Sequence, residues 1–285
     1  MKNLLVSVII PVYNEEEDIE ECLNTLQEQN YKPIEIIIVD DGSTDKTLEI
    51  IKRFKKVKLL KQDHKGPGAA RNFCVKYSKG EIFVFIDADM SFPKDYIENL
   101  IDPILKDKTG KIIGTTRGLE IIKNTDNIWS RCWGKYKATR KSVREAKAFR
   151  SIRKDKFLEM GGFDSRYGYA DDQTFWLKYG VRPTVAEKAV CYHKNPETLK
   201  SVYKQSRWIG SSHDYFWLNV PLFNFLGILL AFFLSPLVIP LFAVKKCHEN
   251  KDWIIFPYMF VFMSARYFGT LRGYVNKILW NINVR

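Results

Sequence analysis

Apolar strand-like runs alternate with helix-like segments through the N-terminal half of the chain, and this alternation constrains the fold most. Runs that predict strands lie at Leu4–Pro11, Ile34–Val39, Val57–Leu60 and Glu81–Ile86. Segments with helical spacing or helix start signals lie at Glu15–Gln29, Asp45–Phe54 and Ala69–Tyr77. The alternation predicts an α/β fold with a mostly parallel, Rossmann-like sheet covered by helices on both faces.

Polar side chains follow the ends of three of these strands. They are Asn14-Glu15, Asp40-Asp41 and the pair Asp87 and Asp89. Ligands of such sheets bind beyond the carboxyl ends of the strands, so we expect the three clusters to share one crevice.

Asp87 and Asp89 flank the small Ala88 directly after a buried strand. Carboxylates two residues apart can both reach one hard cation, and Mg²⁺ or Mn²⁺ commonly combines one or two carboxylates with phosphate oxygens. The two residues therefore predict a divalent-cation site. The alternative is an ordinary solvated turn.

Two further features of this crevice suit a nucleotide. Asp40 or Asp41 could accept a hydrogen bond from a base or ribose hydroxyl, while the other could cap the following helix. The loop that begins at Gly66 precedes a helix, and its amides, together with Arg71, could meet a diphosphate.

Asp171 and Asp172 lie in a glycine-rich, aromatic loop that opens an apolar helix. The adjacent acids could simply stabilise the first turn of that helix. They could also supply a general base whose pKa is raised by the neighbouring carboxylate. His193 ends another apolar stretch and is either structural or a third metal ligand.

Charge and cysteine content narrow the class of protein. Lys and Arg outnumber Asp and Glu by 45 to 33, a net charge of +12, which points to an anionic partner. The five cysteines are scattered without C-x-x-C spacing, which argues against a disulfide scaffold or a cysteine-rich zinc site. Because no nucleic-acid motif accompanies the charge, we attribute it to anionic lipid and phosphorylated substrates rather than to nucleic acid.

The C-terminal quarter has a different composition. Tyr215–Val244 contains no charged residue, and a second apolar run covers Trp253–Ala265. The first run is long enough for a bilayer, although Pro236 and Pro240 should kink or break a helix there. We expect a catalytic domain over residues 1–212 on the cytoplasmic side of a membrane, and membrane-associated helices over 213–285. A buried soluble helix and a re-entrant hairpin are the alternatives.

The segment near residues 128–156 is basic and aromatic. Arg131–Lys156 holds eleven basic and two acidic residues, and Trp129, Trp133 and Tyr136 share one helical face. This pattern is typical of an interfacial helix, and the alternative is a solvated helix packed on the core. Arg117 is a candidate for a substrate phosphate.

The ordered set of motifs resembles the family-two glycosyltransferases, which have the GT-A nucleotide-sugar fold. The resemblance runs over about residues 4–200, from VSVIIPVYNEE through IIIVDDGSTDKT, GPGAARN and FVFIDADM to GGFD and ADDQTFWLK. It implies a metal-dependent enzyme that moves a sugar from a nucleotide-diphosphate donor with inversion at the anomeric carbon.

The resemblance also implies roles for individual residues. Pro11, Tyr13 and Glu15 would line the base and ribose pocket with Asp40 or Asp41. Arg71 would approach the base or diphosphate, and Asp87 and Asp89 would hold a divalent cation against it. Asp172 would deprotonate the acceptor, with Asp171 in the place where the family has glutamate.

The acceptor is less defined. Membrane-bound polymerising members carry Q-x-x-R-W, of which Arg207 and Trp208 match here and the leading glutamine does not. The presence of a candidate base, Asp172, favours a hydroxyl acceptor such as a lipid-linked sugar. A polyprenyl phosphate would have no proton for Asp172 to remove. The alternatives are a polyprenyl-phosphate glycosyl synthase and a non-catalytic nucleotide-binding membrane scaffold.

Overall fold

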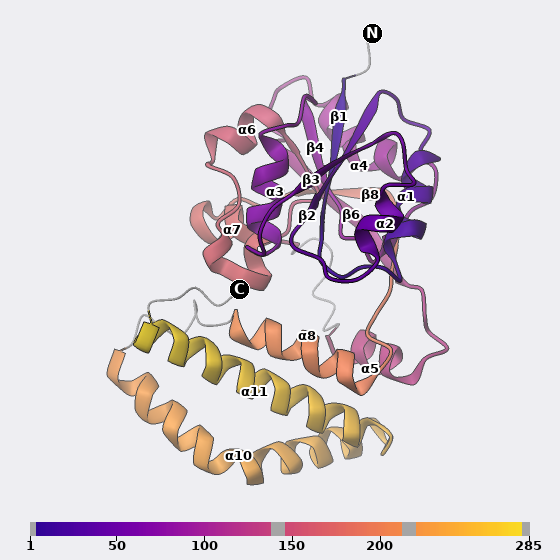
Figure 1. The fold of residues 1–285 in the computed structure, drawn as a ribbon. Coiled ribbons are helices and arrows are strands. Elements are labelled where there is room, and N and C mark those ends of the chain that lie inside the picture. The colour runs from indigo at the N-terminus through magenta and orange to yellow at the C-terminus, as the bar shows by residue number, and fades with distance from the viewer. Residues whose placement is uncertain (1–3, 138–145, 213–220, 281–285) are drawn as a thin grey trace. The chain divides into compact units, whose positions relative to one another are not determined.

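The computed structural model describes residues 4–137, 146–212 and 221–280, without the side chains of 134–137, 221–235 and 274–280 (Figure 1). The strands are β1 (Val6–Val12), β2 (Ile34–Asp40), β3 (Val57–Lys61), β4 (Ile82–Phe85), β5 (Met90–Ser91), β6 (Gly114–Ile122), β7 (Ser151–Arg153) and β8 (Thr184–His193). The helices are α1 (Ile19–Gln27), α2 (Thr47–Ile51), α3 (Pro67–Val75), α4 (Tyr96–Lys106), α5 (Ile128–Lys137), α6 (Lys154–Glu159), α7 (Thr174–Tyr179), α8 (Leu199–Ser211), α10 (Pro221–Asn250) and α11 (Ile255–Trp280), with a 3-10 segment at Ser165–Gln173.

The chain forms two compact units. The first comprises residues 1–123, 140–165 and 171–194 and contains the whole sheet, and the second comprises 124–139, 166–170 and 195–285. The second unit contains α5, α8, α10 and α11. A division of the chain at residue 212 stays a prediction.

The sheet of the first unit is mixed, with the strand order β3-β2-β1-β4-β7-β6-β8-β5. The four strands predicted from the sequence do form a parallel set, β3-β2-β1-β4. The short strand β7 then pairs antiparallel with both β4 and β6, and β5 pairs antiparallel with β8. The expected parallel sheet is therefore confirmed for its first half and corrected to a mixed sheet beyond β4.

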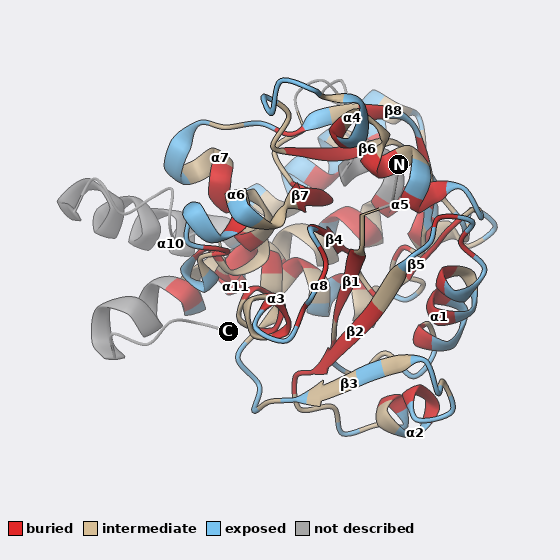
Figure 2. Ribbon diagram, turned by 90° about the horizontal axis from the view of Figure 1, so that it is seen from above, coloured by how far each residue is buried: buried red, intermediate tan, exposed pale blue. Residues whose placement is uncertain are grey.

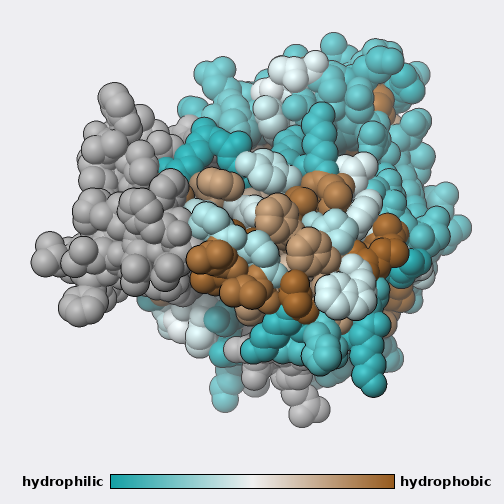
Figure 3. Space-filling view, turned by 90° about the horizontal axis from the view of Figure 1, so that it is seen from below, coloured by the Kyte–Doolittle hydropathy of each residue, from teal (hydrophilic) through white to brown (hydrophobic). Residues whose placement is uncertain are grey.

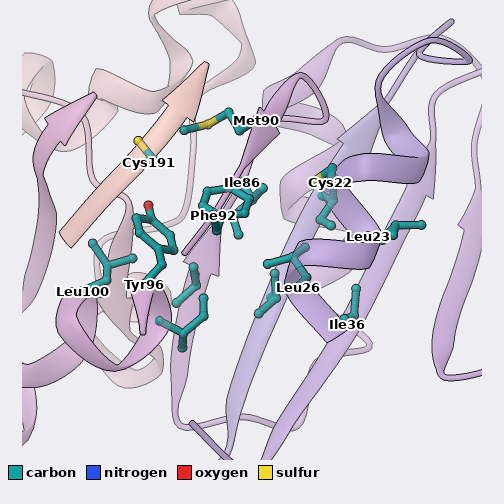
Figure 4. Packing of buried hydrophobic residues seen from close by; sticks show 14 of the residues in the cluster. Cys22, Leu23, Leu26, Ile36, Ile86, Met90, Phe92, Tyr96, Leu100 and Cys191 are labelled. Carbon is teal, nitrogen blue, oxygen red and sulfur yellow. The ribbon is translucent and has the colours of Figure 1, made fainter. Parts of the chain in front are cut away.

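Both faces of this sheet are buried, which explains why its strands read as continuous apolar runs. In β1, Val8 and Ile10 join one core cluster while Ile9 joins the other. Helices α1, α2 and α4 cover the first face, and α3, α6 and α7 cover the second (Figures 1 and 2). Figure 4 shows part of the first cluster, with Leu26 of α1 and Tyr96 of α4 among the side chains packed on the strands.

The interfacial role of the basic, aromatic segment stays a prediction, and residues 138–145 of the segment lie outside the described residues. Its last part is β7 and α6, and Ile152 is buried in the sheet. In α5, Cys132 and Trp133 are buried in the core of the second unit, together with residues of α8, α10 and α11. Trp133 thus packs on the core of the second unit and Trp129 lies partly buried against the same core, whereas the Tyr136 side chain lies outside the described residues.

The apolar C-terminal run lies partly outside the described residues, which omit 213–220 and the side chains of 221–235. Helix α10 continues through Pro236 and Pro240 without ending. In the described part of the chain, no helix combines the length and apolar character needed to cross a membrane. The expected membrane-spanning segment is therefore not supported.

Candidate active site

The loops after β1 and β2 are joined by hydrogen bonds. The Asn14 backbone adopts φ 56°, and its side-chain Oδ1 accepts from the Thr44 amide at 2.8 Å. The Asn14 amide donates to Ser43 Oγ at 3.0 Å, and the Glu15 amide donates to Thr47 Oγ1 at 2.8 Å. These hydrogen bonds join the loops that follow β1 and β2, two strands in which Pro11 is the register partner of Val39.

Asp40 and Asp41 behave differently at this edge. Asp41 is buried, and its carboxylate accepts from the amides of Lys65 and Gly66, each at 2.8 Å. Asp41 therefore orders the loop before α3. Asp40 is also buried, but the contact of its carboxylate is with the Ser43 amide, which donates to Oδ1 at 3.1 Å. Because Asp41 is engaged by more partners, Asp40 is the better candidate for a ligand hydroxyl.

Tyr13 lies beside this loop. Its ring is partly exposed and stacks on His64 with a centroid separation of 4.2 Å. An exposed aromatic face above the ordered strand ends suits a planar base.

Asp87 is held by two arginines. Arg71 Nη2 lies 2.7 Å from its Oδ1, and Arg150 Nη1 lies 2.8 Å from its Oδ2. Burial alone would raise the pKa of Asp87, but the two guanidinium groups outweigh burial and hold that pKa well below its usual range. Asp87 is thus a permanent carboxylate whose oxygens are both already engaged.

Asp89 faces a different partner. Its Oδ2 lies 3.1 Å from His193 Nε2, and its Oδ1 is buried without a hydrogen-bond partner among the described residues. Antiparallel pairing of β5 with β8 produces this approach, because Met90 is the register partner of His193. A buried carboxylate oxygen and an imidazole nitrogen are suitable ligands for a divalent cation. Within the described residues, no three His, Cys, Asp or Glu side chains are placed to hold a metal, so Asp89 and His193 would need ligands from a substrate.

Asp171 is packed against the start of α3. Arg71 Nη1 lies 2.8 Å from Asp171 Oδ1. A Cβ on Gly68 would come within 2.6 Å of Asp171 Oδ2, so only glycine fits there without displacement. Burial raises the pKa of Asp171 to about 7, although Arg71 acts in the opposite direction.

Asp172 is more accessible than Asp171. It is partly exposed, whereas Asp171 is 2% exposed. Burial also raises the pKa of Asp172, against the charges of Arg150 and Arg71. Burial, rather than the neighbouring carboxylate, is the main cause of the raised pKa. Neither acid caps α7, whose N-cap is Gln173 and has no side-chain cap.

Asn72 connects α3 to the GGFD motif. Its Nδ2 donates to the Phe163 carbonyl at 2.7 Å, and its Oδ1 accepts from the Phe163 amide at 3.0 Å. This paired contact holds the loop that leads to Asp171 against the helix that carries Arg71.

The structure therefore joins three of the predicted sites. Asp87, Asp171 and Asp172 share the field of Arg71 and Arg150, so three carboxylates face two guanidinium groups. Ala88 is buried between the two acids of its motif. Burial in this cluster raises the pKa of Asp171 and of Asp172, so each carboxylate accepts a proton more readily than an ordinary aspartate, which is the property expected of a general base.

Arg150 and Asn72 are functional candidates that sequence reasoning missed. Arg150 was counted only as one charge of a basic segment, and its position beside β7 follows from the antiparallel pairing with β4. Asn72 stands directly after Arg71 in the GPGAARN motif, which was the available signal.

The remaining candidates are Arg117, Arg207 and Trp208. Arg117 of β6 pairs with Glu120, and its charge partly opposes the rise in the pKa of Asp172. Arg207 and Trp208 belong to α8 in the second unit, where the Trp208 ring packs edge-on against Tyr169. Their proposed contact with an acceptor stays a prediction.

The first unit combines parallel strands that end in acidic residues with a helix that follows Gly66 and carries Arg71. This arrangement is typical of α/β folds whose ligands bind beyond the carboxyl ends of the strands. The glycosyl transferase family 2 model matches residues 7–160, which is more than half of the chain. The chain belongs to that family.

Curated relatives match only part of the chain. It is 36% identical over 113 residues to glycosyltransferase GlyA of Streptococcus pneumoniae, covering 38% of this chain and 16% of the relative. It is 40% identical over 106 residues to glycosyltransferase AglE of Haloferax volcanii, covering 35% of each. The chain thus matches well under half of the length of these relatives.

Solved structures share the fold. The mannosyltransferase PcManGT of Pyrobaculum calidifontis, in complex with GDP-Man and Mn²⁺, superposes with a TM-score of 0.61 at 20% identity and covers 97% of this chain and 87% of its own. S. aureus TarS 1-349, in complex with UDP-GlcNAc, gives a TM-score of 0.53 at 20% identity, covering 92% and 91%. The similarity confirms a GT-A-like mixed sheet with flanking helices.

Proposed function

We propose that the protein is an inverting, metal-dependent glycosyltransferase that moves a sugar from a nucleotide-diphosphate donor to a hydroxyl acceptor. One observation carries the proposal. Arg71 joins Asp87 to Asp171, and Arg150 is the second partner of Asp87, in a cluster at the carboxyl end of β4 next to Asp89. The charge of Asp172 acts on both arginines of this cluster. The family match and the nucleotide-sugar complexes of two structural neighbours support the same activity.

The donor would occupy the edge formed by the loops after β1, β2 and β4. Tyr13 would stack on the base, and Asp40 would accept a hydroxyl hydrogen bond. Asp41 keeps the Gly66 loop ordered so that the start of α3 faces the diphosphate. Arg71 supplies positive potential from the same helix.

Asp89 and His193 would hold Mn²⁺ or Mg²⁺, with phosphate oxygens of the donor as further ligands. When bound, the cation neutralises charge on the departing diphosphate. Asp87 would act on the donor side only indirectly, because both of its oxygens are held by arginines.

Asp172 is the proposed general base. Its raised pKa and partial exposure suit a carboxylate that must meet an acceptor and take its proton. The acceptor oxygen forms a bond to the anomeric carbon as its proton passes to Asp172. The bond from that carbon to the diphosphate oxygen breaks, and the nucleoside diphosphate leaves with the electron pair. Attack opposite the leaving group inverts the anomeric centre.

A hydroxyl acceptor follows from the presence of this base, and we propose a lipid-linked sugar. A polyprenyl-phosphate acceptor would already be anionic and would need no base. The two cases separate in one variant, because Asp172→Asn should reduce transfer to a hydroxyl by about 10²–10⁴-fold and leave transfer to a phosphate nearly unchanged.

The test is a donor screen with the purified full chain. Radiolabelled UDP- and GDP-sugars are incubated with a membrane lipid extract, with Mn²⁺ or with a chelator. We expect label in the lipid phase with one donor, and its loss with the chelator and in Asp89→Ala. Asp155→Ala, which changes an exposed aspartate of α6, is the matched control and should transfer normally.

Two results would count against the proposal. Transfer that survives the chelator and Asp89→Ala would exclude the proposed cation site. Failure of every donor to bind, measured by calorimetry with UDP and GDP, would exclude a nucleotide-diphosphate donor.

A further inference from the structure

The outer surface of α10 is apolar where a soluble helix is normally polar. Leu237 and Leu241 are 66% and 67% exposed, and Val238 and Phe242 beside them are also exposed. These residues recur at i and i+4, so they form two adjacent stripes along one side of the helix. Ala243 and Cys247, on the opposite side, are fully buried in the core of the second unit. Over residues 237–243, α10 is therefore apolar on its solvent side as well as on its core side.

The same surface continues past the end of α10. Trp253, which is 64% exposed, and Ile254 precede α11 and extend outward. We define the apolar face as Leu237, Val238, Leu241, Phe242, Trp253 and Ile254. Figure 3 shows hydrophobic side chains gathered on one surface of the molecule. Several large exposed apolar side chains close together along the chain mark an interaction surface.

Positive charge accompanies the apolar face. The second unit has 14 Lys and Arg against 5 Asp and Glu, so nine of the twelve net positive charges of the chain lie in it. Lys245 and Lys251, at the end of α10, are exposed between Phe242 and Trp253. Lys246 lies 5.5 Å from the Phe242 ring and pairs with Glu249.

We propose that the second unit binds the surface of an anionic lipid bilayer through this apolar face. Large apolar side chains, an exposed tryptophan and flanking lysines are the chemistry of a helix that lies in the headgroup region. A second copy of the chain fits less well, because it would bring together two units that each carry nine net positive charges. Binding would hold the enzyme at the surface where a lipid-linked acceptor resides.

The test measures binding of the full chain to vesicles, without any donor or acceptor, so its failure would leave the proposed transferase activity untouched. Vesicles of phosphatidylcholine alone, and with phosphatidylglycerol, are sedimented with the protein at increasing salt. We expect at least tenfold stronger partition to the anionic vesicles, weakening as salt rises.

Substitutions test whether the apolar face and its neighbouring lysines bind the vesicles. The double substitution Leu237→Glu with Leu241→Glu should reduce partition at least tenfold, while its melting temperature stays near that of the wild type because both side chains are exposed. Leu158→Glu is the matched control, since Leu158 of α6 in the first unit is 55% exposed, and it should bind normally. Lys245→Glu with Lys251→Glu should abolish the preference for anionic lipid.

Three outcomes would overturn the proposal. They are equal partition to neutral and anionic vesicles, unchanged partition of the double leucine variant, and a dimer in sedimentation velocity runs without lipid that the leucine substitutions dissociate. The third outcome would assign the apolar face to a second copy.

Discussion

The contact between Arg150 and Asp87 should contribute far more to stability than an exposed ion pair of the same protein. Their closest atoms are 2.8 Å apart, and the Arg150 side chain is 10% exposed. Taking charge centres about 4 Å apart, the attraction at an effective dielectric constant near 20 is about 4 kcal/mol. Asp87 keeps Arg71 as a second partner, and its side chain is 32% exposed. We therefore expect a coupling free energy of about 2 kcal/mol.

A double-mutant cycle measures this coupling. Urea unfolding is followed by fluorescence and circular dichroism for the wild type, Arg150→Ala, Asp87→Ala and the double variant. Arg53 and Glu49 form the control pair, because their side chains are 57% and 68% exposed, with Glu49 in α2 and Arg53 just past its end. Their coupling should be about 0.2–1 kcal/mol, as for other exposed ion pairs. The reasoning is refuted if the buried pair couples no more strongly than the control pair.

The pH dependence of the same variants provides a second check. The folded-state pKa of Asp87 lies below its usual 3.8, so its contribution to stability is complete above about pH 4 and is lost as pH falls through the folded value. Removing Arg150 raises the folded pKa and reduces that contribution. The stability gap between wild type and Arg150→Ala should therefore narrow as pH falls below about 4. A gap that widens on acidification would contradict the assigned ion pair.

Three more predictions concern the neighbouring residues. Gly68→Ala should cost about 1–3 kcal/mol of unfolding free energy by overpacking against Asp171 and should also weaken donor binding. Gly110→Ala is the control: Gly110 has φ 70° and open space around it, so the variant should lose a similar free energy through backbone strain but bind donor normally. Equal donor binding by the two variants would contradict the role given to the contact between residue 68 and Asp171. The kcat/KM of the wild type should rise with pH through a midpoint above 3.8, the ordinary pKa of an aspartate, and Asp172→Asn should remove this rise. If the rise remains in the variant, another residue is the base. Because the pKa of Asp171 in the folded state is raised to about 7, the stability of the protein should fall as pH rises between about 4 and 7. In thermal melts, Asp171→Asn should make the melting temperature depend less on pH over this range. An unchanged dependence would exclude Asp171 as its source.

The geometry of the cluster gives adjacent acids different roles. Asp171 is fixed between Arg71 and the α3 start, so its carboxylate mainly orients its surroundings. Asp172 shares the same field but reaches solvent. Asp87 and Asp89 separate in the same way, with Asp87 held by arginines and Asp89 directed to His193. In each pair, one acid is a positioning residue and the other remains available to a ligand.

Some features could not be read from the sequence because they depend on contacts between distant segments. Arg150 reaches Asp87 only because β7 pairs antiparallel with β4. The motif Asp87-Ala88-Asp89 suggested two equivalent metal ligands. In the structure, Arg71 and Arg150 occupy both carboxylate oxygens of Asp87, so the two aspartates are not equally available to a cation. The aromatic residues of α5 matched an interfacial helix, but the same pattern suits burial against another helix, and Trp133 is buried.

The sequence by itself determined the parallel half of the sheet. Both faces of β1 and β2 are covered, and strands buried on two sides must be continuously apolar, so local composition is sufficient to find them. It also determined that acids follow the strand ends, because these residues stand directly after the apolar runs that mark the strands. Only the tertiary structure decided which acid is paired, which is buried and which is exposed. Those properties follow from the charges that packing brings within about 4 Å, where the interaction is strong enough to shift a pKa.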